Sequence, residues 1–391
     1  MIRHTLRAFV FSATRVVAAT SVLASVLASV AGAQGAIANL GFGYPVGGGS
    51  VRTNATGGAF AEFDALTPTN PAALGGVARP VLSAQAEPEL RTLSVNGVSE
   101  KSRLQRVPLL MLIFPASHGL AVGISATTFL DRTFSTATTG SAQVNGLSIP
   151  TTDQIEVRGA INDLRAGVGW QLSSRFRVGA AGHLYTGEHR ATRERTFADT
   201  LKFGSVLDSS RVTYYGTALS VGGEATLGKG FTALASYRRG NEINARVRDT
   251  IVSRATAPAR TGLALRFDGI VGSVFAVGFE HIGWSQMAAL GSTAATSRDA
   301  MNWHAGAEVA GPRFRGSPTL LRGGMARNEL PFVLPGQTAR ENRLSAGIGL
   351  PVAGEDAVID LSVQRATRSM SASSTKESAW LLGIGVQIRP R

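Results

Sequence analysis

Arginine and histidine side chains on the polar face of alternating segments are the residues best suited to chemistry in this chain. Four of them are candidates for binding the headgroup of a ligand: Arg165, Arg177, His183 and Arg266. A guanidinium binds a carboxylate through two parallel hydrogen bonds, so an acidic headgroup is the expected ligand. The same face carries acceptors for these cations: Glu224, Glu280, Asp360 and Gln364. The alternative is therefore a mutually neutralising network that fills a polar interior.

The six histidines do not form a recognisable metal or catalytic site in the sequence. None pairs with a carboxylate at ligand spacing, and no cysteine could complete a zinc site. A hydrolase with Ser and His on adjacent strands stays open, because triads assemble in space. The stretch 223–230 nearly spells a phosphate loop, but Gly230 stands where Ser or Thr is required. We expect no catalytic residue, no metal and no cofactor.

The segments that would position these side chains alternate apolar and polar residues, which is typical of β-strands with one apolar face. Around Trp170 the apolar residues occupy every second position, and after the Ser173-Ser174 turn the pattern repeats. About fourteen such segments recur at a spacing of roughly 22 residues, enough for a strand and its connection. Their centres lie near residues 88, 108, 125, 160, 181, 217, 238, 262, 279, 305, 322, 345, 361 and 383.

The connections favour a membrane barrel over a soluble β-sandwich. Short turns alternate with longer links near 134–152, 190–210, 245–257, 287–299, 328–340 and 368–377, as in outer-membrane barrels. The chain beyond residue 33 has no run of ~20 apolar residues, and lipid accommodates only helices or closed barrels. We therefore predict an all-β fold, a transmembrane antiparallel β-barrel of about 14 strands.

Residues 1–33 have the features of a signal peptide, with three arginines before an apolar run and a small-x-small site at 31–33. Their removal would lower the formal charge from +13 to +10. The remaining arginines are spread singly, without a nucleic-acid motif, so we expect no nucleic-acid partner. Anionic lipid headgroups are the more plausible partner for an exported basic chain.

A glycine-rich and acidic stretch, residues 56–74, precedes the first strand. It holds Gly57, Gly58, Phe60 and Asp64, and ends in Asn70-Pro71-Ala72. Asn before Pro initiates a turn, so the residues alone predict an irregular plug or a linker. The stretch resembles the start of the FadL/OMPP1/TodX family, outer-membrane transporters of long-chain fatty acids and other hydrophobic compounds. A related family of secretion-associated barrels begins in a similar way.

The resemblance implies a 14-stranded barrel whose lumen is plugged by a hatch with the Asn-Pro-Ala motif. Asn70, Pro71 and Ala72 would be the hatch motif, with Gly57, Gly58 and Phe60 as companions. It further implies that a ligand enters from outside and leaves sideways through a gap near a kinked early strand. The third strand, residues 119–129, is the candidate for the kink, because its small residues around Ser125 pack weakly.

The resulting prediction has three parts: a signal peptide (1–33), a hatch (34–78) and the barrel (79–391). The predicted function is a non-enzymatic channel in the outer membrane of a Gram-negative-type bacterium, which takes up hydrophobic small molecules such as long-chain fatty acids. The expected partners are outer-membrane lipid, the ligand and the barrel-assembly machinery. The alternative is a structural or secretion-associated barrel that docks partner proteins. An open polar porin is a weaker alternative, because a hatch would obstruct conduction.

Overall fold

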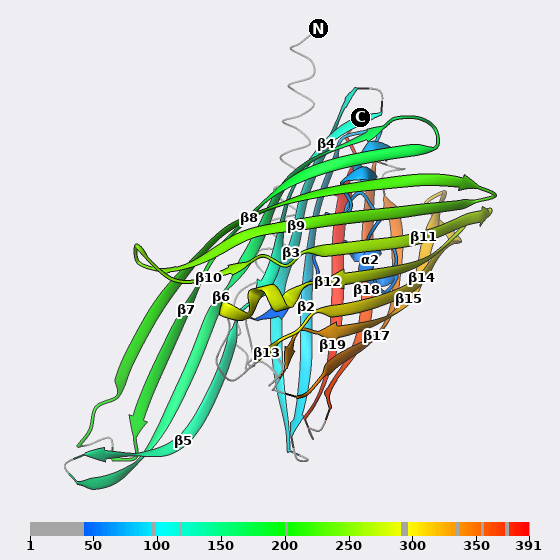
Figure 1. Ribbon diagram of the computed structural model, residues 1–391. Coiled ribbons are helices and arrows are strands. Elements are labelled where there is room, and N and C mark those ends of the chain that lie inside the picture. The colour runs from blue at the N-terminus through cyan, green and yellow to red at the C-terminus, as the bar shows by residue number, and fades with distance from the viewer. Residues whose placement is uncertain are drawn as a thin grey trace, which may run out of the picture.

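The chain folds into a closed, antiparallel β-barrel of fourteen strands (Figure 1). The computed structural model describes residues 43–390 except 96–97, 118, 145, 200–201, 291–295, 334–335, 353–355 and 372–374. The barrel strands are β2 (Val81–Val95), β3 (Val98–Ser117), β4 (Leu120–Asp131), β6 (Leu147–Gln171), β7 (Phe176–Phe197), β8 (Val206–Gly228), β9 (Phe231–Val247), β11 (Arg260–Ile270), β12 (Ser273–Ile282), β14 (Ala300–Phe314), β15 (Ser317–Leu330), β17 (Ala339–Val352), β18 (Ala357–Met370) and β19 (Lys376–Ile388).

Each barrel strand pairs with the next one, and β19 pairs with β2 to close the ring. Smaller elements decorate it: β1 (Tyr44–Pro45), α2 (Val51–Ala55), η2 (Pro71–Gly76), β5 (Phe134–Val144), β10 (Thr250–Thr256), η3 (Trp284–Leu290), β13 (Thr296–Ser297) and β16 (Phe332–Val333). Short turns join the strands at one rim, here called the short-turn rim, and longer connections lie at the opposite, long-loop rim.

All fourteen predicted centres lie within barrel strands, so the alternation identified the wall correctly. The prediction of long links at 134–152 and 190–210 was wrong, because strands β5 to β8 run through most of both ranges. These strands project beyond the long-loop rim as a sheet, at the lower left of Figure 1. Their Thr- and Ser-rich sequence shows little apolar alternation, since both of their faces carry polar side chains.

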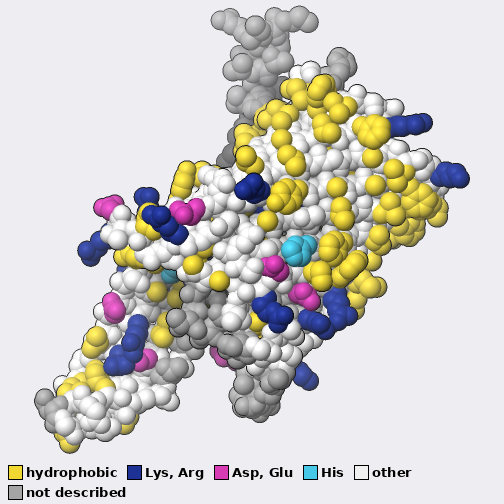
Figure 2. Space-filling model, in the orientation of Figure 1, with side chains coloured by type: hydrophobic (Ala, Val, Ile, Leu, Met, Phe, Trp, Pro, Cys, Tyr) yellow, Lys and Arg dark blue, Asp and Glu magenta, His cyan; other side chains and the backbone are white. Residues whose placement is uncertain are grey.

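The wall turns its apolar side chains outward and its polar side chains inward. On β19, Trp380, Leu382 and Ile384 are exposed, whereas Glu377 and Gln387 are buried. Figure 2 shows the outward apolar side chains as a broad field on the barrel. Among the described residues, no helix has the length and apolarity needed to cross a bilayer.

Residues 43–80, here called the N-terminal segment, run through the barrel lumen before β2 begins (Figure 1). Helix α2 contacts β15, β17, β18 and β19, while η2 contacts β4, β6, β7 and β8. The segment therefore spans the lumen from one wall to the opposite one. The predicted signal peptide and residues 34–42 of the predicted hatch lie outside the described residues.

Candidate functional site: the lumen and the N-terminal segment

The Asn-Pro-Ala motif forms a capped turn that packs tightly on the barrel wall. The side chain of Asn70 accepts a hydrogen bond from the Ala72 amide (3.0 Å), which caps η2, and Pro71 occupies its first position. The wall residues that contact the motif are glycines. A Cβ built on Gly179 would lie 2.4 Å from the Pro71 carbonyl carbon, and one on Gly222 would lie 1.8 Å from Asn70 Oδ1. Side chains on these wall positions would displace the motif.

Gly57 and Gly58 meet the opposite wall in the same way. Both have positive φ angles (66° and 91°), a conformation that side chains rarely adopt. A Cβ on Gly57 would lie 2.5 Å from the Met325 amide nitrogen, and one on Gly58 would lie 2.5 Å from His304 Nδ1. Phe60 is fully buried, with its ring centroid 4.5 Å from that of Phe63. The structure thus gives each of these predicted motif residues a packing role within the lumen.

Two carboxylates fix the middle of the N-terminal segment. Asp64 is buried and accepts hydrogen bonds from the hydroxyls of Ser50 and Thr53, and from the Leu66 amide (3.3 Å). It therefore ties the segment to itself. Glu62 points outward to the wall, where it accepts a hydrogen bond from Arg260 Nη2 (2.7 Å).

The start of the segment is held by a buried cluster of charges around Tyr44. The Tyr44 hydroxyl donates to Glu341 Oε2 (2.6 Å) and accepts from Arg368 Nη2 (2.6 Å). Burial raises the pKa of the Tyr44 phenol, so the ring stays neutral. The cluster joins four arginines to four carboxylates and is balanced in number: Arg91, Arg106, Arg343, Arg368, Glu89, Asp131, Glu341 and Glu377.

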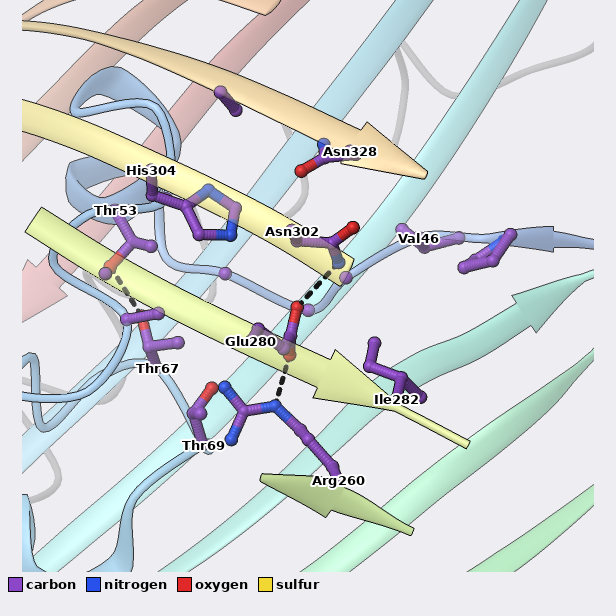
Figure 3. Close-up of a pocket in the computed structure, with 18 of the residues that line it drawn as sticks. Val46, Thr53, Thr67, Thr69, Arg260, Glu280, Ile282, Asn302, His304 and Asn328 are labelled. Carbon is purple, nitrogen blue, oxygen red and sulfur yellow. Dashed lines mark hydrogen bonds and ion pairs between the residues drawn. The ribbon is translucent and has the colours of Figure 1, made fainter. Parts of the chain in front are cut away.

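The segment separates two cavities. The first, of about 220 Å³, lies on the long-loop side, and Phe129, Asp163, His183, Arg238 and Trp284 are among its lining residues. Figure 3 shows another part of its wall, where Arg260, Glu280 and Asn302 form a hydrogen-bonded row beside the N-terminal segment. The second, of about 500 Å³, lies on the short-turn side. Axial passage is thus obstructed by the segment.

The first cavity borders both an apolar cluster and cations. Phe129 stacks on Trp284 with ring centroids 5.4 Å apart, in a cluster that also contains Tyr185 and Tyr214. The guanidinium of Arg238 lies 5.8 Å from the Phe129 ring, and its Nη1 lies 3.7 Å from Asp163 Oδ2. Its Nε has no hydrogen-bond partner in the described part of the chain. An amphiphilic ligand could therefore place its apolar part and its acidic group side by side here.

Arg165 and His183 lie directly opposite each other on β6 and β7, near Arg238. Arg165 is 4% exposed, and within the described residues its Nε and Nη2 have no hydrogen-bond partner. A buried cation without a partner is costly, so an anion arriving here would gain strong, charge-assisted hydrogen bonds. His183 differs, because its Nδ1 lies 2.9 Å from Asp163 Oδ2. The sequence shows no histidine at ligand spacing from a carboxylate, and this pair was not apparent there because its members are 20 residues apart and meet only across the strands.

Ser220 completes a row with this pair, because its Oγ lies 2.9 Å from His183 Nε2. A neutral ring donates from Nδ1 to Asp163 and accepts from Ser220, which is the order of groups in hydrolytic triads. Ser220 is only 3% exposed, however, and is not among the residues that line the first cavity. The row joins β6, β7 and β8 through buried side chains.

Arg177 and Arg266, the other two predicted headgroup residues, lie apart from Arg165 and nearer the short-turn rim. Arg177 pairs with Glu224 (2.9 Å), and Arg266 pairs with Asp268 (3.2 Å). Each therefore already has a carboxylate partner, although Arg266 Nε has no hydrogen bond in the described part of the chain. Arg238 was not predicted as a site residue, although the outward position of Tyr237 in the alternation indicates that Arg238 faces inward.

The wall is interrupted between β3 and β4. Their ladder ends at Leu109 and Thr127, and β4 has a bulge between Thr128 and Leu130. Beyond this point β4 pairs on its free edge with β1, while β3 continues along β2 alone in the described part of the chain. One side-chain bridge spans the interruption, from Arg106 Nε to Asp131 Oδ2 (3.0 Å).

The arrangement matches that of solved outer-membrane channels. A Pseudomonas aeruginosa FadL homologue superimposes with a TM-score of 0.63 at 11% identity, covering 89% of this chain and 100% of that chain. The chain has the FadL-type fold. The Pseudomonas putida toluene transporter TodX gives 0.56 at 13% identity, covering 88% and 99%. The monoaromatic hydrocarbon channel CymD gives 0.55 at 14%, covering 89% and 98%.

No protein-family model and no curated protein matches the chain. At 11–14% identity, the FadL-type likeness concerns the fold and not the cargo. The function of this chain must therefore be argued from its own lumen residues.

Proposed function

We propose that the protein is an outer-membrane channel for the passive uptake of hydrophobic small molecules, with no catalytic step. The observation that carries this proposal is the combination of an obstructed lumen with an interrupted wall between β3 and β4. Hydrophobic compounds are what the solved channels of this fold are named for. Residues 34–78 act as the hatch in this proposal, and 1–33 as the signal peptide. Barrel-assembly machinery would insert the chain.

The cargo in this proposal is an acid with a long apolar chain, such as a fatty acid. Arg238 lines the first cavity with an Nε that has no hydrogen-bond partner in the described part of the chain, and the cluster around Phe129 and Trp284 accepts the apolar part. Arg165 does not line this cavity itself but lies opposite His183, which does. Of the predicted headgroup residues, Arg165 takes the carboxylate and His183 stays engaged with Asp163. Arg177 and Arg266 serve the wall.

Ligands leave sideways through the interruption between β3 and β4. A long apolar chain gains nothing by entering water when lipid lies beside the opening. The bridge from Arg106 to Asp131 and the short β1 strand close this path at its long-loop end. The hatch must release β1 before the path is clear.

Binding of a fluorescent long-chain fatty acid to the refolded protein tests the cargo. Replacing Arg165 by Gln should weaken binding about tenfold or more, because a hydrogen bond to a charged group is worth about 1.5–3 kcal/mol. Arg266→Gln is the matched control and should bind as the unchanged protein. A fatty alcohol of equal length should bind equally to all three. Equal affinity of the Arg165 variant for the acid would contradict the headgroup assignment.

Cross-linking tests the exit. The chain has no cysteine, so pairs can be placed freely. A thiol cross-linker between Arg106→Cys and Asp131→Cys should stop import of the fatty acid into cells. The same reagent between Met111→Cys and Ser125→Cys, register partners in the intact ladder, should not. Import that continues with the first pair closed would contradict lateral exit.

The long-loop side also offers an observation in favour of partner docking. The projecting sheet exposes three apolar side chains: Leu147 (68%), Val206 (55%) and Leu207 (66%). A barrel that docks partner proteins would use such a surface. Failure of both the acid and the alcohol to bind the folded barrel would favour this second function.

A further inference from the structure

The outer wall carries, besides its apolar field, a row of cations that the uptake function does not use. Six of them lie on adjacent strands near the long-loop rim, here called the basic arc: Lys101 and Arg103 on β3, Arg327 on β15, Arg340 on β17, Arg365 on β18 and Lys376 on β19. Their neighbours along each strand, such as Gln364 and Glu377, are buried in the lumen. Alternation therefore places the arc on the outside. In Figure 2, Lys and Arg side chains gather along the lower edge of the apolar field.

The strand register arranges the arc in tiers. One tier crosses six strands through direct partners: Met325, Leu344, Arg365, Trp380, Leu90 and Arg103. The next tier toward the long-loop rim is polar throughout: Arg327, Asn342, Thr367, Ser378, Thr92 and Lys101. A third continues with Arg340, Ser369, Lys376 and Ser94. Below the first tier the outward residues are apolar, as Val363 and Leu382 illustrate.

The first tier marks a membrane boundary. Trp380 is 47% exposed, and Arg365 lies 5.0 Å from its ring, a combination typical of the headgroup level. The polar tiers thus lie at the depth of lipid headgroups, in the leaflet on the long-loop side. This step rests on the membrane location in the proposed function.

The cations of the arc have no carboxylate partners in the described part of the chain. Exposed arginines elsewhere do: Arg158 pairs with Glu156 (2.6 Å) and Arg211 with Glu188 (3.7 Å). One acidic residue, Glu329, lies in the third tier as the register partner of Arg340. Its carboxylate accepts a hydrogen bond from the Met301 amide (3.1 Å) and forms no ion pair with Arg340 in the described part of the chain. With six cations against this one carboxylate in its tiers, the arc keeps a net positive charge.

We propose that the basic arc binds the phosphates of a phosphorylated glycolipid in the outer leaflet. The cations supply charge-assisted hydrogen bonds to phosphate oxygens. The amide and hydroxyl side chains between them match the hydroxyls of a sugar headgroup. The apolar rows below hold the acyl chains beside Trp380.

Titration of the refolded, detergent-bound full chain with diphosphorylated lipid A, followed by native mass spectrometry, tests the proposal. The arc variant carries Arg103→Gln, Arg327→Gln and Arg365→Gln. The control carries Arg158→Gln, Arg211→Gln and Arg254→Gln, which removes the same charge from arginines that have carboxylate partners. The arc variant should bind about tenfold or more weakly, and the control within about twofold of the unchanged chain.

Equal losses in both variants would show that net charge alone acts, and would overturn the proposal. So would lipid A that binds equally well after its phosphates are removed. Phosphatidylglycerol should bind more weakly than lipid A; equal binding would overturn the glycolipid assignment. Fatty-acid binding in the first cavity should stay unchanged in the arc variant, so failure of this proposal and of the uptake function are distinguishable.

Discussion

The N-terminal segment is held at its start by buried ion pairs and hydrogen bonds, and at its end by close packing against glycines of the wall. The charged anchor is Tyr44 with the arginines and carboxylates around it, all buried except Arg343, which is 17% exposed. The glycine anchor is Asn70-Pro71-Ala72 seated against Gly169, Gly179 and Gly222. A charged anchor is stable only while every member has its partner. A glycine anchor needs no specific partner, only space, so the two ends should respond to different perturbations.

Filling the space at the glycine anchor should have the largest effect. Gly179→Ala would put a Cβ 2.4 Å from the Pro71 backbone, which cannot turn away as a side chain could. We expect a loss of about 3 kcal/mol, the upper end for overpacking, and release of η2. Limited proteolysis within 56–78 and thermal unfolding measure this.

Gly182→Ala is the matched control on the same strand, since a Cβ there meets nothing within 4 Å. Equal protease resistance of both variants would show that the glycine anchor does not depend on shape.

Removing one hydroxyl at the charged anchor should have a smaller effect, confined to the start of the segment. Tyr44→Phe leaves Glu341 and Arg368 each without one buried hydrogen bond, at a cost of about 1–3 kcal/mol. Hydrogen exchange at 44–50 should accelerate while exchange at 70–76 stays unchanged. Tyr237→Phe, on the exposed outer face, should change neither. Faster exchange at both ends would mean that the anchors act as one.

The smallest effect on stability is expected from charges outside the two anchors, where ion pairs are exposed to water. In the projecting sheet, hydrogen bonds from Arg195 and Arg193 hold the pKa of Asp153 well below its usual range. A carboxyl with a lowered folded-state pKa stabilises above its unfolded pKa of about 3.9, and this contribution is lost only as the pH falls through the folded value. Circular dichroism of the protein should therefore be flat between pH 8 and 5, for Asp153→Asn as well. A transition in that window would contradict this assignment.

The two anchors also differ in how well the sequence predicts them. Asn70-Pro71-Ala72 is contiguous, and local turn chemistry marks it. The charged anchor joins Tyr44 to Glu341, 297 positions away, so no local pattern relates them. Even when the alternation correctly places Arg368 on the inner face, its partners stay undetermined until the register of every strand pair in the wall is known.

The strands were predictable because the bilayer-facing side demands apolar residues at every second position. The projecting sheet was not, because that demand ends outside the membrane. The candidate site follows the same rule. The alternation predicted that Arg165 faces inward, whereas its lack of a partner depends on where Asp163 and His183 meet.

The position of Tyr44 has a consequence for how the molecule is assembled. The charges clustered around it come from both sides of the seam where the first and last barrel strands join: Glu89 and Arg91 on β2, Arg106 on β3, Glu341 on β17, Arg368 on β18 and Glu377 on β19. An open sheet would lack the two ion pairs that cross this seam, Arg368 with Glu89 and Arg91 with Glu377. These pairs favour one alignment of the final strand pair over its neighbours, and Tyr44 adds to that preference if the segment lies inside the barrel when the seam closes.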